Sequence, residues 1–266
     1  MTDIAVIILV GKEELHIRRC LEKLAPLEPR QIFVVESQKG DRTHEIAVEM
    51  GATTVWHDWP GQHSTQFNWA LDNCKIETRW VLRLDADEYL TPETIELIKR
   101  VIETNQDDEV TGYSLELGRT FWGEPVCRGV GRMWLGRLFR AGIGRCEDKK
   151  MDEHIVVSKG RIEPLIGGKF IDDNLNGIDW WSQKHLGYAA REAQDALEGF
   201  KKGQKGLYYK LPPYWRALAY FIYRYILRGG FLEGRRGFKW HFFQGLWYRM
   251  LVDAKIEGMR GEGKRE

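Results

Sequence analysis

Cysteine and long apolar runs are the two features that this sequence has little of. Its 266 residues include four cysteines, which lie far apart and without a CxxC or His-paired spacing. A zinc site and a disulfide framework are therefore not indicated, and a reducing, intracellular compartment fits this usage. The apolar run Ile4–Val10 follows the acidic Asp3 and is shorter than the core of a secretory signal, so we expect a buried strand there.

The sequence also has no excess of charge of either sign, with a net charge of +1, but its charges are distributed unevenly along the chain. Residues 1–200 contain 25 Lys/Arg and 34 Asp/Glu, a net charge of −9, whereas residues 201–266 contain 15 and 5, a net charge of +10. A basic segment of this kind is typical of proteins that bind nucleic acid or an anionic membrane surface, and it also occurs as a solvated charged face.

Short apolar segments alternate with helical periodicity over the first 102 residues. The helical segments Ile17–Leu24 and Phe67–Cys74 follow the i, i+3, i+4, i+7 spacing that buries one face of a helix. This alternation predicts an α/β fold with a Rossmann-like, mostly parallel sheet and flanking helices, whereas residues 110–175 favour irregular strands and loops. The expected strands are Ile4–Val10, Ile32–Val35, Thr53–Trp56 and Trp80–Leu84.

An acidic cluster follows the fourth expected strand directly. Asp85 and Asp87 stand two residues apart, so in an extended chain both carboxylates would point to one side and meet one cation. Carboxylate oxygens suit Mg²⁺ or Mn²⁺, which commonly bridge a protein to a substrate diphosphate. Ligands of open α/β sheets bind beyond the carboxyl ends of the strands, where this pair is expected.

Four motif-like segments follow one another along the chain: IAVIILVGKEE, IFVVESQKGDRTHEIAVEMGA, GQHSTQFNWAL and WVLRLDADEYL. In this order they resemble the family 2 glycosyltransferases with a GT-A fold, especially bacterial enzymes that build lipopolysaccharide or exopolysaccharide, and the last is similar to the DxD strand of the family. Three departures touch the nucleotide pocket: Gly11-Lys12 replaces the usual Lys-Asn, Glu36 replaces Asp, and Phe67 stands where an Arg is often found. The resemblance therefore leaves the base, uracil or guanine, open.

The resemblance implies roles for particular residues. A divalent metal, Mn²⁺ or Mg²⁺, is expected at Asp85 and Asp87. KKMDEHIVV is similar to the later acidic motif that supplies the general base, which predicts Glu153 as the base and Asp152 as the alternative. The positions expected to contact the nucleotide-sugar donor are Val10, Glu13, Glu36, Gln66, Asn68 and Asp85.

Two aromatic, basic segments near the C-terminus, Tyr214–Leu227 and Phe238–Leu251, predict amphipathic helices too short to cross a bilayer. On the first helix, arginines 216, 224 and 228 fall on one side, with Leu218, Phe221, Ile222 and Tyr225 on the other. YILRGGFLEGRRGFKW also resembles the tail of membrane-associated family members. We therefore expect an interfacial helical tail, with docking on the catalytic domain as the alternative. Nucleic acid is not expected, because the aromatics form helical stripes.

Together these features predict a GT-A-like domain over residues 1–205 and a basic aromatic tail over residues 206–266. The expected enzyme is a metal-dependent, inverting hexosyltransferase, cytoplasmic and peripheral on the inner face of the membrane. Its acceptor would be a lipid-linked or lipopolysaccharide-core saccharide. The alternatives are a sugar-phosphate nucleotidyltransferase, whose glycine-rich loop the Val10–Glu13 segment fits poorly, and a catalytically inactive membrane-associated scaffold.

Overall fold

The computed structural model describes residues 1–105, 107–147, 154–198 and 208–262. These residues form two compact units. Unit 1 comprises residues 1–120 and 132–175, and unit 2 comprises residues 121–131 and 176–266. The domain boundary predicted between residues 205 and 206 lies outside the described residues and stays a prediction.

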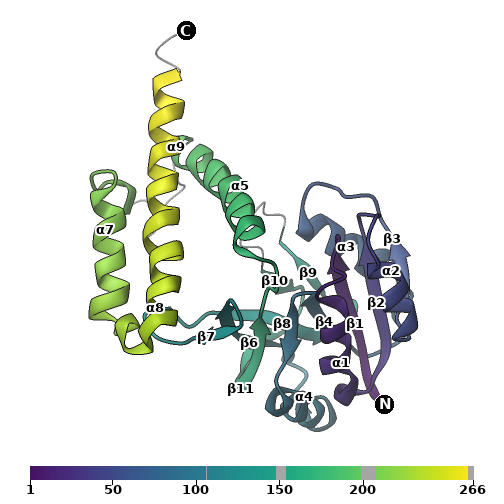
Figure 1. The fold of residues 1–266 in the computed structure, drawn as a ribbon. Coiled ribbons are helices and arrows are strands. Elements are labelled where there is room, and N and C mark those ends of the chain that lie inside the picture. The colour runs from purple at the N-terminus through teal and green to yellow at the C-terminus, as the bar shows by residue number, and fades with distance from the viewer. Residues whose placement is uncertain (106, 148–153, 199–207, 263–266) are drawn as a thin grey trace. The chain divides into compact units, whose positions relative to one another are not determined.

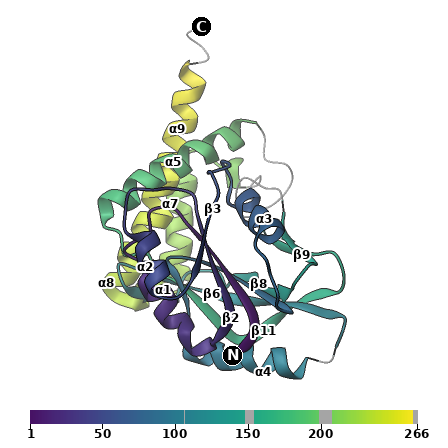
Figure 2. The same cartoon turned by 90° about the vertical axis from the view of Figure 1, so that its right-hand side faces the viewer.

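The first half of unit 1 alternates strands and helices as the apolar pattern predicts. Its strands pair in parallel in the order β3-β2-β1-β4, with the helices packed on their faces (Figures 1 and 2). The elements are β1 (Thr2–Val10), α1 (Ile17–Leu24), β2 (Pro29–Glu36), α2 (Thr43–Glu49), β3 (Thr53–Trp56), α3 (His63–Asn73) and β4 (Trp80–Asp85).

The second half of unit 1 extends the same sheet, giving the order β3-β2-β1-β4-β8-β6-β11-β5. Strand β8 is antiparallel to both β4 and β6, so parallel pairing is confined to β3-β2-β1-β4 and β6-β11. The α/β class with a central sheet and flanking helices is thus confirmed, but residues 110–175 form longer strands than expected. These elements are β5 (Glu88–Leu90), α4 (Pro92–Thr104), β6 (Val110–Phe121), β8 (Trp134–Arg140), β9 (Gly144–Cys146), β10 (Ile155–Val157) and β11 (Arg161–Asp172).

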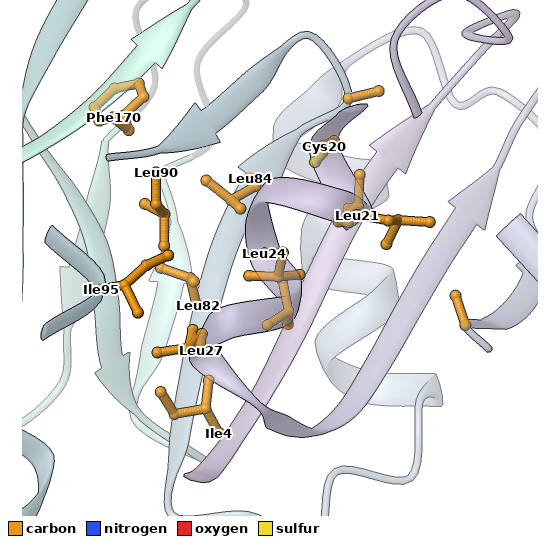
Figure 3. Packing of buried hydrophobic residues seen from close by; sticks show 14 of the residues in the cluster. Ile4, Cys20, Leu21, Leu24, Leu27, Leu82, Leu84, Leu90, Ile95 and Phe170 are labelled. Carbon is orange, nitrogen blue, oxygen red and sulfur yellow. The ribbon is translucent and has the colours of Figure 1, made fainter. Parts of the chain in front are cut away.

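The alternation of side chains along the central strands divides the core of unit 1 into two layers. On one face, Ile4, Leu82 and Leu84 pack with Leu21 and Leu24 of α1, as Figure 3 shows. On the other face, α3 covers the strands through Phe67 and Ala70. Burial of this apolar surface on both faces explains why Ile4–Val10 of β1 reads as a continuous apolar run.

Unit 2 is built from helices and one short strand. Helix α5 (Ile178–Leu197) packs on α9 (Tyr248–Glu262) through alanines 189 and 193 and Val252. The other elements are β7 (Glu124–Val126), α7 (Trp215–Ile222), the π-helical η2 (Tyr223–Leu227), η3 (Gly230–Glu233), α8 (Gly234–Trp240) and the π-helical η4 (His241–Trp247). The two expected tail helices are therefore present, each broken by a π-helical segment.

The arginines of the first tail segment differ from the amphipathic prediction of a solvated charged side. Arg216 is 4% exposed, and its guanidinium pairs with the buried carboxylate of Asp253 on α9. The Nε atom of Arg224 donates to the carbonyl oxygen of Gly129 at 3.0 Å. Two of the three arginines predicted on one side of the helix thus point toward unit 2, because each has a hydrogen-bond acceptor there.

Within the described ranges, no helix combines the length and the apolar character needed to span a bilayer.

Candidate functional site

Three of the predicted donor-site residues meet at the carboxyl edge of the parallel strands. Val10 is the register partner of Glu36, and Leu9 is the register partner of Asp85, so the ends of β1, β2 and β4 lie side by side. This is the edge where open α/β sheets bind ligands.

The chain turns immediately after Asp85. Residues 86 and 87 form a turn between β4 and β5, so the extended geometry assumed for the acidic pair does not hold. Asp85 and Asp87 are nevertheless both partly exposed, whereas the intervening Ala86 is buried. Two partly exposed carboxylates at the strand end match the oxygen donor set that Mg²⁺ and Mn²⁺ prefer, together with a substrate phosphate.

A buried ion pair supports this turn from beneath. The amide N–H of Asp85 donates to Glu88 Oε2 at 2.9 Å, and the other carboxylate oxygen of Glu88 pairs with Arg137. Burial raises the pKa of Glu88 well above its usual value, and the charge of Arg137 opposes that rise. The pair therefore fixes the backbone at Asp85 from the side away from solvent.

The segment after β11 reaches Asp87, a contact that no sequence motif predicted. Asn174 Nδ2 donates to Asp87 Oδ2 at 3.0 Å. Arg19 of α1 anchors this segment, since Nη1 donates to Asp173 Oδ2 at 2.5 Å and Nη2 donates to the carbonyl oxygen of Asp87 at 3.3 Å. Asn174 is therefore a polar neighbour of the predicted metal ligand. The contact between Arg19 and Asp173, which are 154 residues apart in sequence, holds it there.

A buried arginine, Arg83, lies beside Asp85. Arg83 is 6% exposed, and its Nη2 lies 3.9 Å from Asp85 Oδ1. Its guanidinium covers the ring of Phe67 at 5.1 Å, and Nη1 donates to the Sγ atom of Cys146 at 2.9 Å. Arg83 therefore places a buried positive charge beside the carboxylate of Asp85.

His16 connects the loop after β1 to the segment after β11. The amide N–H of Leu175 donates to His16 Nε2 at 2.9 Å, so the protonated nitrogen is Nδ1, which donates to Glu13 Oε2 at 2.6 Å. The carboxylate of Glu13, predicted near the nucleotide, is thus held in a fixed orientation by a buried imidazole.

The loops after β1 and β2 hold each other through side-chain caps. The amide N–H of Glu13 donates to Thr43 Oγ1 at 2.8 Å, and the amide N–H of Glu14 donates to Asp41 Oδ2 at 3.1 Å. Asp41 and Thr43 therefore have a structural role in joining the two loops.

Val10 and Glu36 already have partners of their own. Both the amide and the hydroxyl of Ser37 donate to the carbonyl oxygen of Val10, at 3.1 and 3.0 Å. Glu36 is 7% exposed, and its Oε1 lies 2.8 Å from His44 Nδ1.

Gln66 and Asn68 differ sharply although both lie on α3. Asn68 exchanges two hydrogen bonds with the backbone of Cys146, at 3.0 and 2.9 Å, and so ties β9 to the helix. Gln66 is 1% exposed, and its Nε2 has no hydrogen-bond partner in the described part of the chain. A buried amide donor of this kind is costly unless a ligand or a water accepts from it.

The two candidate bases, Glu153 and Asp152, lie outside the described residues. The structure therefore places only their surroundings: β10 begins at Ile155 and pairs antiparallel with β9, with Ile155 opposite Cys146.

No cluster of three or more His, Cys, Asp or Glu suited to a metal exists among the described residues. The candidate metal site thus rests on Asp85 and Asp87 alone, with Asn174 beside them. Two carboxylates are sufficient for Mg²⁺, which keeps its water and phosphate ligands, so the residues present fit the group.

Comparison with known sequences identifies the family. The sequence model of glycosyl transferase family 2 matches residues 5–144, which include the β1, β2 and β4 edge and both α3 positions. The chain belongs to this family. An uncharacterized glycosyltransferase of Rickettsia typhi is 25% identical over 247 residues, which cover 88% of this chain and 82% of that protein. A second, of Rickettsia bellii, is 29% identical over 114 residues, 43% of this chain and 37% of the other.

Two solved structures align with part of the chain. Glucosyl-3-phosphoglycerate synthase from Mycobacterium tuberculosis, in complex with Mn²⁺, UDP and glucosyl-3-phosphoglycerate, aligns with a TM-score of 0.35 and 16% identity. The alignment covers 44% of each chain. A crystal structure of a mycobacterial protein aligns with a TM-score of 0.36 and 20% identity, over 44% of this chain and 41% of the other.

Proposed function

We propose that this family 2 glycosyltransferase is an inverting hexosyltransferase that moves a sugar from a UDP- or GDP-sugar. The acceptor in this proposal is a lipid-linked or lipopolysaccharide-core saccharide at the cytoplasmic face of a membrane. The observation that carries the proposal is the position of Asp85 and Asp87, partly exposed at the carboxyl edge of β4 in a chain of this family.

In this proposal each segment at the edge has a separate task. Asp85 and Asp87 hold Mn²⁺ or Mg²⁺, which would neutralise the charge that develops on the departing diphosphate. Glu13, Glu36 and Gln66 shape the nucleotide pocket, while Asn68 fixes the strand that borders it. Asn174 orients the carboxylate of Asp87 through its hydrogen bond of 3.0 Å.

The proton of the acceptor hydroxyl passes to a carboxylate as that oxygen attacks the anomeric carbon from the face opposite the diphosphate. Glu153 is our candidate for this base, and Asp152 is the alternative. The basic tail supports a membrane-bound acceptor, because an enzyme seated on a bilayer meets lipid-linked substrates without releasing them to solution.

The proposal is tested by thermal shift of the purified chain with UDP and with GDP, each with and without Mn²⁺. A ligand that binds only the folded state raises the melting temperature. We expect a metal-dependent shift with one nucleotide, which would also identify the base of the donor. A well-folded sample that shows no shift with either nucleotide at millimolar concentration would contradict the donor site.

Asp87→Asn separates metal binding from folding. We expect turnover to fall by orders of magnitude and the metal-dependent shift to disappear, while the melting temperature without ligand stays unchanged. Asp108→Asn, in the exposed turn before β6, is the matched control and should behave like the wild type. Near-normal turnover of Asp87→Asn would remove the metal site.

A further inference from the structure

Large apolar side chains are exposed along one continuous part of unit 2. Helix α7, η2, η3 and α8 together present eight of them, with exposed fractions from 44% to 73%. We call this set the outer apolar face: Trp215, Ile222, Tyr223, Ile226, Leu227, Phe231, Leu232 and Phe238. Its helical part runs from residue 215 to residue 227, about 18 Å at 1.5 Å per residue.

The rotation of α7 is fixed by polar contacts on its inner side. Arg216 is bound to Asp253 of α9, and the same carboxylate accepts the amide N–H of Tyr214 at 2.7 Å. Arg224 is bound to the carbonyl oxygen of Gly129. The helix cannot turn its apolar side inward without breaking these buried pairs, so the exposure of the outer apolar face is built into unit 2.

The turn between η2 and α8 (Figure 1) is also constrained, by its glycines and by Glu233. Gly229 has φ +73°, and a Cβ atom on Gly237 would lie 2.2 Å from the carbonyl oxygen of Gly230. Glu233 Oε1 accepts the amide N–H groups of Cys127 and Arg128 at 2.9 and 3.1 Å. The glycines and the acid of the segment GGFLEGRRGF therefore build a rigid turn that presents Leu227 and Leu232 to solvent.

The charges around this face are almost all positive. From residue 199 to residue 252 the sequence contains one acidic residue, Glu233, whose side chain is only 3% exposed. Lys210, Arg228 and Arg235 are exposed at the two ends of the face. Lys239 lies 3.9 Å from Glu124, which partly offsets its charge.

A hollow next to the face combines cations with aromatic rings. It is lined by Tyr225, Gly234, Arg235, Phe238 and Lys239. Cations set among aromatic and apolar side chains at an exposed surface suit the phosphate and the upper acyl region of an anionic lipid.

We infer that the outer apolar face is the surface that enters an anionic bilayer, with α7 lying along the membrane plane. Apolar and aromatic side chains would enter the interfacial layer, while Arg228 and Arg235 pair with lipid phosphates. The inference rests on the membrane location in the proposed function. Of the three arginines that the helical pattern placed on one side, only Arg228 is exposed and available to a phosphate, because Arg216 and Arg224 are bound within unit 2. A second copy of the chain is the competing occupant.

Flotation of the full-length chain with vesicles tests the inference. One set is phosphatidylcholine alone, and the other contains about 30% phosphatidylglycerol, because basic residues respond to anionic lipid. Wild type should float with the anionic vesicles. The double variant Leu227→Ser/Leu232→Ser should lower the partition coefficient about tenfold per leucine. Arg228→Gln/Arg235→Gln should lower it about fivefold per charge, and only on anionic vesicles.

Matched variants decide between outcomes. Ile166→Ser removes an apolar side chain that is 73% exposed in unit 1, as Leu227 is in unit 2, and should leave flotation unchanged. Equal binding by wild type and the double leucine variant would overturn the inference. A wild-type dimer that Leu227→Ser/Leu232→Ser converts to a monomer, seen by light scattering after gel filtration, would assign the face to a second copy instead. Failure of the wild type to float on either vesicle, with nucleotide shifts intact, would refute the membrane seat but not the transferase chemistry.

Discussion

Helix α1 of unit 1 and helix α7 of unit 2 use similar amphipathic patterns in opposite ways. α1 buries the four residues that the periodicity selects, from Ile17 to Leu24, against the sheet. α7 buries Arg216 and exposes Trp215 and Ile222. Periodicity therefore divides a helix into two faces, but the partner available on each side decides which face is inside.

Buried charges also differ between the two units. In unit 1, Arg83, Glu88 and Arg137 cluster beneath the acidic pair, where they hold a candidate site in place. In unit 2, the buried pair of Arg216 and Asp253 joins α7 to α9. The same kind of interaction thus supports chemistry in one unit and the orientation of a surface in the other.

The largest effect that would sharpen this comparison comes from breaking the pair in unit 2. Arg216→Met leaves the carboxylate of Asp253 buried without its cation, which typically destabilises a protein by about 3–5 kcal/mol. Arg228→Met, at the exposed residue that follows η2, should change stability by less than about 0.5 kcal/mol. Urea unfolding followed by tryptophan fluorescence measures both. Equal, small effects would show that Arg216 is not inside.

A pH-dependent effect of intermediate size is expected from His241. The imidazole is 0% exposed, and its Nε2 donates to the carbonyl oxygen of Arg128. Burial, aided by the charge of Arg224, lowers the pKa of His241 from 6.5 to about 4. Between these values the unfolded chain binds a proton that the folded chain does not. Stability therefore falls as the pH drops from 6.5 to 4, by about 1.4 kcal/mol per unit and about 3 kcal/mol in total.

His241→Gln should flatten this part of the stability curve, whereas His63→Gln, an exposed site in unit 1, should not. Denaturant midpoints at several pH values between 4 and 7 give the slopes. Identical slopes for wild type and His241→Gln would contradict a neutral, buried imidazole.

The smallest effect concerns Gln66. Gln66→Leu removes a buried amide donor that has no partner among the described residues, so stability without ligand should rise slightly or stay unchanged, within about 1 kcal/mol. If the nucleotide accepts a hydrogen bond from the Gln66 amide, its affinity, measured by calorimetry, should fall about tenfold in this variant. Asn68→Leu is the contrast, because it breaks two hydrogen bonds to Cys146 and should cost about 1–3 kcal/mol. An unchanged affinity in Gln66→Leu would exclude this residue from the pocket.

The sequence by itself determined the elements of the first half of unit 1 and the place of the acidic pair. Apolar strands such as β1 and helices such as α1 are specified by local periodicity, and a parallel sheet aligns its strand ends at one edge. The order of four short segments predicted the family, and the family model that matches residues 5–144 confirmed it.

Tertiary structure alone decided which distant residues meet at that edge. Asn174 reaches Asp87, and His16 joins Glu13 to Leu175, through contacts between segments far apart in sequence. The inward direction of Arg216 was likewise set by Asp253, 37 residues away. Local patterns carry no information on such partners, because a polar side chain is buried only where another chain segment supplies the hydrogen bond or the opposite charge.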